Sequence, residues 1–255
     1  MTQIEEINRE TVEGWKWVVL DIDGVLIDPS DSYDRAVKQT GELLLSKMGI
    51  DEKIGLETVR SFRKKGRFGD DYKVTEGLIL AQMSGDIEGF VSDFPRGEDL
   101  NWIRNRVGEK IGRGKVKKRF DRFYFGENNP ENIAESDGFW RREKPLVDTD
   151  LLERIEENSC FGYITGRSRE EIALAEEILD YQLRNVVTRD EYQKPDPRAL
   201  TSLVDGDSGV YIGDTYNDKL LVDNFNKSGG DFSFVAIDEN METNDVLERI
   251  LNWKM

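Results

Sequence analysis

The stretch VVLDIDGVLID, residues 18–28, places two carboxylates directly after an apolar run. A short run of aliphatic residues is typical of a buried strand, so Asp21 and Asp23 should follow the end of a strand. Side chains alternate in direction along an extended chain, and both acids should therefore share one face. Two like charges at this separation repel each other, and we expect a cation to offset them.

Helices and short apolar strands alternate from about residue 147 to the end of the sequence. The expected strands are CFGYITG, RNVVTRD, GVYIGDT and DFSFVAID, which begin at residues 160, 184, 209 and 231. Strands separated by helices in this way run parallel and are covered on both faces. With the strand expected at residues 15–23, the pattern predicts a doubly wound α/β domain.

A segment of different character, residues 30–144, separates the first strand from this series. Helical patterns begin in it at residues 32, 55, 71 and 98, and no strong strand is evident. Large insertions are tolerated where a loop leaves a sheet. We therefore predict an α/β domain made of residues 1–29 and 145–255, interrupted by a helical domain at residues 30–144.

The composition excludes several classes of function. The 52 acidic and 36 basic residues give a net charge of -16, which argues against a general binder of nucleic acid or anionic membranes. Histidine is absent, so no mechanism can use an imidazole base, and the single cysteine, Cys160, excludes an intramolecular disulfide. Residues 1–10 lack a leader-like pattern, and no stretch resembles a membrane span. We expect a cytoplasmic protein without nucleic-acid or membrane partners; the oligomeric state stays open.

Polar residues follow the other predicted strands as well. Because the carboxyl ends of parallel strands meet at one edge of a sheet, these residues should lie near the two acids of the first strand. They are Thr165, Gly166, Lys194, Asp214 and Asp218. A cluster of carboxylates without His or Cys favours Mg²⁺ over Ca²⁺. One carboxylate would remain able to attack phosphorus and form an aspartyl-phosphate.

Four motifs in this order resemble those of the haloacid dehalogenase-like hydrolases. VVLDIDGVLID is similar to the first motif of that superfamily, FGYITGRS to the second, KPDP to the third and VYIGDTYND to the fourth. The motifs span residues 18–218. The resemblance implies a Rossmann-like α/β core with a helical cap inserted between motifs one and two, as in the first subfamily.

The resemblance also implies catalytic and metal-binding roles. It implies that Asp21 is the nucleophile and that Asp23 is the general acid and then the general base. The side chains of Asp21 and Asp214 and the main-chain carbonyl of Asp23 would bind Mg²⁺, with Asp218 as a further ligand or as its support. The alternatives from the residues alone are a polar turn after a strand for the first two acids and a favourable charge at a helix start for Asp218.

The same resemblance implies phosphate contacts that also serve catalysis. Thr165 and the main-chain amide of Gly166 would hold phosphoryl oxygens, and Lys194 would neutralise both the phosphate and the nucleophile. Gly24 is assigned to the substrate contacts with them. Taken alone, Thr165 could instead cap a helix, and Lys194 could be an ordinary loop lysine.

Asp23 indicates the type of reaction. In the resembled superfamily, an acid two residues after the nucleophile accompanies phosphate-ester chemistry, because an alkoxide leaving group needs a proton. We therefore predict a Mg²⁺-dependent phosphomonoester hydrolase that acts on a small phosphorylated metabolite through an aspartyl-phosphate. A sugar phosphomutase of the same superfamily and a non-catalytic relative that binds a phosphorylated ligand stay open as alternatives.

A basic stretch stands out against the acidic background. Nine basic residues and two acidic residues lie between Arg104 and Arg122. Such a stretch is typically a solvated face paired with nearby acids. The functional alternative is recognition of an anionic leaving group by one or two of these side chains, and binding of nucleic acid is the least favoured interpretation.

Overall fold

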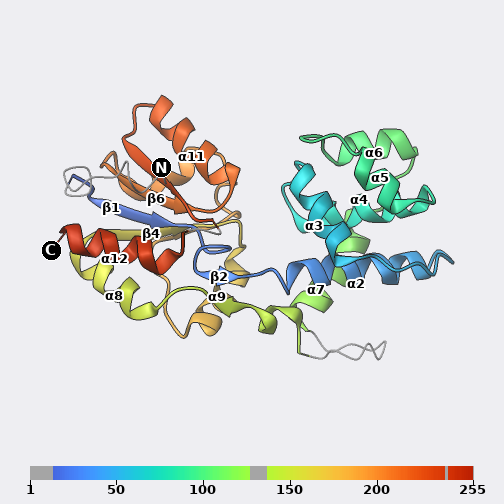
Figure 1. Ribbon diagram of the computed structural model, residues 1–255, viewed down its shortest axis with the longest axis horizontal. Helices are drawn as coiled ribbons and strands as arrows, with labels where there is room; N and C mark the ends of the chain where they lie inside the picture. Colours follow the sequence, from blue (N-terminus) through green and yellow to red (C-terminus); the bar gives the residue numbers. More distant parts are fainter. Residues whose placement is uncertain (1–13, 127–136, 239–240, 255) are drawn as a thin grey trace. The chain divides into compact units, whose positions relative to one another are not determined.

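The computed structural model describes residues 14–126, 137–238 and 241–254. The chain divides into two compact units, Met1–Pro29 with Lys144–Met255 and, between these segments, Ser30–Glu143 (Figure 1). We call the first the α/β unit and the second the helical unit. The first ten residues, from which the absence of a leader was predicted, lie outside the described residues. No described helix is long and apolar enough to cross a membrane.

Five parallel strands form the sheet of the α/β unit in the order β5-β4-β1-β6-β7. Their bounds are β1 Trp17–Leu20, β4 Cys160–Ile164, β5 Val186–Val187, β6 Gly209–Gly213 and β7 Phe232–Ala236. From the central strand β1 the chain first builds β4 and β5 on one side and then β6 and β7 on the other. The order reverses at β1, and open α/β sheets bind ligands at such a point. The doubly wound prediction is confirmed.

Helices cover both faces of this sheet because the strands are apolar on both sides. Helices α8, α9 and α12 pack on one face and α10 and α11 on the other, and Figure 1 shows α8 and α12 opposite α11. The bounds are α8 Thr149–Asn158, α9 Arg169–Leu179, α10 Arg198–Val204, α11 Tyr216–Lys227 and α12 Thr243–Lys254. Helices therefore cover both faces, and the edge at the carboxyl ends of the strands remains accessible to ligands.

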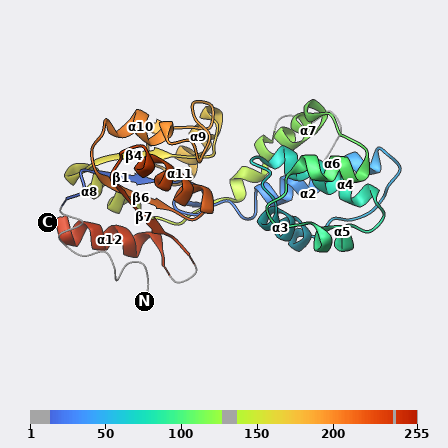
Figure 2. The same ribbon diagram turned by 90° about the horizontal axis from the view of Figure 1, so that it is seen from above.

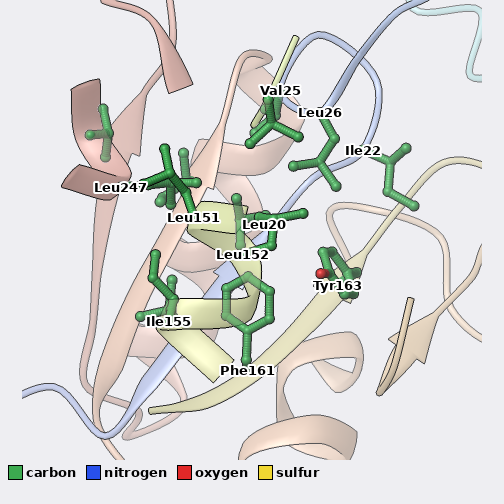
Figure 3. Packing of buried hydrophobic residues seen from close by; sticks show 14 of the residues in the cluster. Leu20, Ile22, Val25, Leu26, Leu151, Leu152, Ile155, Phe161, Tyr163 and Leu247 are labelled. Carbon is green, nitrogen blue, oxygen red and sulfur yellow. The ribbon is translucent and has the colours of Figure 1, made fainter. Parts of the chain in front are cut away.

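The core beneath α8 and α12 holds β1 in place. Leu20 of β1 packs in one cluster with Leu152 and Ile155 of α8 and with Leu247 of α12 (Figure 3). Leu20, Leu152 and Ile155 are fully buried, and burial of each such side chain contributes about 1.5–3 kcal/mol. This packing fixes the carboxyl end of β1, from which the first two acids project.

A short antiparallel pair marks the place where the helical unit is inserted. Strand β2, Ile27–Asp28, pairs with β3, Lys144–Pro145, in the register Ile27 to Pro145. The helical unit begins at Ser30 and ends at Glu143. The insertion thus leaves the α/β unit and returns to it at neighbouring positions.

The helical unit contains no strand among its described residues. Its α-helices are α2 Tyr33–Ser46, α3 Leu56–Lys65, α4 Asp71–Met83, α5 Ile87–Asp93, α6 Leu100–Val107 and α7 Arg113–Phe125 (Figure 2). A 3₁₀ turn, Phe139–Arg142, closes the unit. The four expected helical patterns correspond to α2, α3, α4 and α6, whereas α5 and α7 were not expected.

Candidate active site

Asp21 follows the last residue of β1 and is buried. Its Oδ1 accepts a hydrogen bond from the Ile22 N–H at 2.7 Å, and its Oδ2 lies 2.8 Å from Lys194 Nζ. Its own N–H donates to the Ile212 carbonyl at 2.9 Å, which ties it to β6. Burial raises the pKa of Asp21 because it removes water from the carboxylate, and the Lys194 ammonium opposes this shift.

Lys194 lies between two buried carboxylates. Its Nζ is 2.8 Å from Asp21 and 2.5 Å from Asp218, and only 10% of its side chain is exposed. Burial alone would lower the pKa of Lys194, but the two carboxylates outweigh it and the pKa is raised. The side chain therefore stays charged at neutral pH, and it is not a solvated loop lysine.

Asp218 lies in the first turn of α11 and is fully buried. Its Oδ2 accepts from the Thr215 N–H at 2.9 Å while its own N–H donates to Thr215 Oγ1 at 3.2 Å, which is a capping box. The Thr215 hydroxyl also lies 2.5 Å from Asp218 Oδ2. Its Oδ1 faces Lys194. Burial alone would raise the pKa of Asp218, but Lys194 lowers it. Asp218 thus supports the helix start and also holds the lysine.

The hydroxyl of Tyr211, in β6, lies within hydrogen-bond distance of both Asp218 and Lys194. Its hydroxyl oxygen lies 2.9 Å from the Ile164 carbonyl, 3.0 Å from Asp218 Oδ1 and 3.3 Å from Lys194 Nζ. Tyr211 is fully buried, and this burial raises its pKa, so the hydroxyl keeps its proton. The sequence motifs did not indicate this residue, which connects the ends of β4 and β6 with the lysine.

The side chains of Asp21, Asp214 and Asp218 form a cluster suited to a cation. One oxygen of each lies within 4.8 Å of the others, and the Asp23 carboxylate is not part of the group. Protein atoms packed around the Asp214 carboxyl raise its pKa to about 6, and the charge of Asp218 adds to this shift. Three carboxylates against one ammonium leave excess negative charge, and oxygen-only ligands fit Mg²⁺.

Gly24 makes room for this cluster. Its φ is 75°, and a Cβ atom at this position would lie 2.1 Å from Asp214 Oδ2. A larger residue here would therefore be strained in its backbone and would also displace the carboxylate. This space supports the assignment of Asp214 to a cation site and gives Gly24 a structural role beside the predicted substrate contact.

We expect Gly24→Ala to weaken Mg²⁺ binding about 10–100-fold, as loss of support around a metal ligand commonly does. The substitution should also lower the free energy of unfolding by roughly 1–2 kcal/mol, because alanine is strained in the left-handed backbone conformation. Mg²⁺ titration followed by thermal unfolding would measure both effects. Gly114→Ala is the matched control, because a Cβ there meets no atom within 4 Å. An unchanged Mg²⁺ affinity would contradict the role of Gly24.

Thr165 and Gly166 follow β4 at the same edge of the sheet. Thr165 is buried, its N–H donates to the Val187 carbonyl at 3.0 Å, and its Oγ1 accepts from the Arg167 N–H at 3.1 Å. The cap of α9 is Ser168. Thr165 therefore does not cap that helix, and its hydroxyl proton can donate to a ligand. Gly166 is exposed, and its free Cβ position meets no atom within 4 Å.

Asp23 has a cation of its own. Arg167 Nε and Nη2 lie 3.0 Å and 2.5 Å from Asp23 Oδ1. Each of the two acids after β1 thus has its own cationic partner, Lys194 for Asp21 and Arg167 for Asp23. Arg167 belongs to the FGYITGRS motif, but the sequence gave no sign of this partner.

The basic stretch is partly neutralised within the helical unit. Arg104 binds both carboxylate oxygens of Glu76 at 2.9 Å. Two further ion pairs join Arg113 to Asp70 and Lys117 to Asp121. A cavity of about 270 Å³ is lined by Arg67, Tyr72, Lys73, Glu76, Asp99, Leu100, Asn101, Arg104 and Arg113. These pairs support the interpretation as a solvated, paired face; recognition of a leaving group by this stretch stays a prediction.

Comparison with known proteins places this geometry among phosphatases. No family model and no curated protein sequence matches the chain. Among solved structures, it is similar to phosphatase Tt82 from Thermococcus thioreducens, with 45% identity, a TM-score of 0.84 and coverage of 92% of this chain and 99% of that chain.

More distant structures share the fold. A predicted phosphoglycolate phosphatase from Haemophilus somnus 129pt has 14% identity and a TM-score of 0.54, covering 88% of this chain and 85% of its own. A haloacid dehalogenase-like hydrolase from Bacteroides fragilis has 17% identity and a TM-score of 0.51, covering 92% and 93%. With the four motifs at the ends of β1, β4 and β6 and in the loop that carries Lys194, the chain belongs to the haloacid dehalogenase-like hydrolase superfamily.

Proposed function

We propose that the protein is a Mg²⁺-dependent phosphomonoester hydrolase that acts on a small phosphorylated metabolite through an aspartyl-phosphate. The observation that carries this proposal is the buried Asp21 carboxylate, held 2.8 Å from Lys194 beside Asp214 and Asp218. Phosphatases among its relatives support the reaction class. A cytoplasmic location belongs to the same proposal.

The cation site is part of the proposal. The side chains of Asp21 and Asp214 and the main-chain carbonyl of Asp23 would hold Mg²⁺, with Asp218 supporting them through Lys194. When bound, the ion would offset the charge of the nucleophile and of the phosphoryl oxygens. The protein itself already supplies one positive charge at this point, the Lys194 ammonium.

In the first step, an Asp21 carboxylate oxygen attacks phosphorus, and the bond from phosphorus to the ester oxygen breaks. Asp23 gives a proton to the departing oxygen, which leaves as an alcohol. The Thr165 hydroxyl, the Gly166 amide and Lys194 hold the phosphoryl oxygens. The product on the enzyme is a mixed anhydride between Asp21 and phosphate.

In the second step, water attacks the phosphorus of this aspartyl-phosphate. Asp23, now ionised, takes a proton from the water, and the bond from phosphorus to Asp21 breaks. Phosphate leaves and the Asp21 carboxylate is restored. Each proton given in the first step is thus recovered in the second, so the cycle needs no other acid or base.

The helical unit would be the cap that selects the substrate in this proposal, with the predicted bounds 30–144. This unit has its own aromatic cluster, which includes Phe62, Phe68, Phe94 and Trp102, and its own ion pairs, such as Arg104 with Glu76. Whether the acceptor is water or a second sugar hydroxyl separates the hydrolase from the phosphomutase.

A screen of phosphorylated metabolites for phosphate release tests the proposal. We expect release from at least one small phosphate ester in the presence of Mg²⁺ and a loss of about 10²–10³-fold or more in excess chelator, because the ion provides transition-state charge stabilisation. Addition of Mg²⁺ should restore the rate. Beryllium fluoride should inhibit the enzyme and raise its melting temperature by occupying the phosphoryl position on Asp21.

Transfer of the phosphoryl group to a second position of a sugar, without release of phosphate, would instead identify a phosphomutase. A protein that binds a phosphate ester but never labels Asp21 in a single turnover would be the non-catalytic relative. Release that persists in chelator would contradict the metal requirement.

A further inference from the structure

The guanidinium of Arg167 is the most deeply buried cation beside the site, with 0% of its side chain exposed. It lies just after the Thr165-Gly166 turn and reaches Asp23, which is 144 positions earlier in the chain. Its Nε and Nη2 lie 3.0 Å and 2.5 Å from the same oxygen of Asp23, Oδ1. Asp23 itself remains partly open, with 27% of its side chain exposed.

The other oxygen of Asp23 has a different environment. Among the described residues, no hydrogen bond reaches Asp23 Oδ2. A charge-assisted pair of hydrogen bonds to one oxygen anchors that oxygen and leaves the second oxygen to other molecules. The two oxygens are therefore unequal before any ligand binds.

The main chain of Arg167 is fixed as firmly as its side chain. Its N–H donates to Thr165 Oγ1 at 3.1 Å, and its carbonyl accepts from the Arg189 N–H at 3.1 Å. Arg189 also donates to the Gly166 carbonyl at 2.9 Å and pairs with Glu171 at 2.7 Å. The turn assigned to phosphate binding and the orientation of Asp23 are thus set by one connected group of hydrogen bonds.

We propose that Arg167 is the positioning residue for Asp23, holding Oδ1 so that Oδ2 exchanges the proton with the leaving-group oxygen and then with water. This inference rests on the proposed function. Arg167 acts through Asp23 and does not touch the reacting atoms in this role. It separates the two acids at the end of β1: Lys194 serves the nucleophile and Arg167 serves the proton carrier.

The proposal predicts a distinct pattern of losses. A poor leaving group, such as an alkyl oxygen, needs the proton in the first step, whereas p-nitrophenolate leaves without it. A misplaced Asp23 should therefore slow alkyl phosphates most. The second step needs Asp23 for every substrate, so the aspartyl-phosphate should accumulate with p-nitrophenyl phosphate.

Arg167→Lys is the test, because it keeps the positive charge but cannot place two donors on one oxygen. We expect kcat for an accepted alkyl phosphate to fall about 10²-fold and single-turnover labelling of Asp21 by p-nitrophenyl phosphate to fall less than tenfold. Acid quench during turnover should trap more labelled enzyme than in the wild type. The Mg²⁺ concentration for half-maximal activity should stay within about twofold, since Arg167 binds the side chain of Asp23 and not the three clustered carboxylates.

Asp23→Asn provides the reference. If Arg167 acts through Asp23, the variant carrying both changes should be no slower than Asp23→Asn alone. Arg169→Lys is the matched control, because Arg169 lies on the same turn but is exposed and pairs with Glu191. Its rates should equal those of the wild type. Thermal unfolding of each variant identifies losses caused by damage to the fold.

Two results would overturn the inference. One is an equal loss for alkyl and p-nitrophenyl phosphates in Arg167→Lys, which would place the guanidinium on the phosphoryl group itself. The other is an additive loss in the double variant. An inactive wild type that never labels Asp21 would instead refute the proposed function, so the two failures are distinguishable.

Discussion

Asp21→Asn is expected to reduce phosphate release by roughly 10⁴-fold or more, because the amide cannot attack phosphorus. The substitution keeps the size of the side chain. Its amide oxygen can still accept the Ile22 N–H, and Lys194 keeps its second partner, Asp218, at 2.5 Å. The fold should therefore persist, and circular dichroism together with a phosphate-release assay would measure both quantities.

Asp205→Asn is the control for this change. Asp205 is exposed, and its φ of 41° is one that asparagine also adopts readily. It should leave activity and melting temperature unchanged. Full activity of Asp21→Asn would require a different nucleophile, and loss of the folded state would show that the carboxylate serves stability first.

Lys194→Met is expected to lower kcat about 10²–10³-fold and to destabilise the protein without Mg²⁺. Removal of the ammonium takes away one cation from the phosphoryl position. It also leaves the buried carboxylates of Asp21 and Asp218 without their shared partner. Removing one partner of a buried ion pair commonly destabilises a protein by about 3–5 kcal/mol. Steady-state kinetics and thermal unfolding in chelator would give the two values.

A matched change, Lys227→Met, lies on the exposed end of α11 and should alter neither quantity. Saturating Mg²⁺ should return part of the stability lost in Lys194→Met, because the ion also offsets the clustered carboxylates. A variant as stable in chelator as the wild type would mean that the two acids take up protons instead of remaining charged.

The α/β fold was accessible from the sequence because its signals are local. Each parallel strand is buried on both faces, and so it appears as a short apolar run such as VVL or CFGYI. The polar residues that end these runs had to meet at one edge. This argument brought Asp21, Lys194, Asp214 and Asp218 together without any distance.

The pairing within the site was not accessible in the same way. Arg167 meets Asp23 across 144 residues, and Tyr211 meets the Ile164 carbonyl across 47. A strand pattern predicts where a residue lies along the edge but does not predict which rotamer carries its head group to which oxygen. Tyr211 in particular reads as one more apolar residue of β6.

The helical unit shows another limit of local patterns. Helix α7 buries Val116, Phe120, Phe123 and Tyr124, which have helical spacing. This pattern was not recognised in the sequence, because Gly112 and Gly114 lie at the start of the helix and many basic residues lie between the buried ones. Helix α5 has only seven residues, too few for a periodic signal.

The pairing of β2 with β3 has a consequence for how such a molecule can change. The helical unit, Ser30–Glu143, connects β2 to β3 and so takes the place of the loop in a two-stranded hairpin. The entropy of closing a loop grows only with the logarithm of its length, so helices can be added to or removed from this unit at little cost to the rest. Evolution can therefore rebuild one module while the strand that carries Asp21 stays as it is.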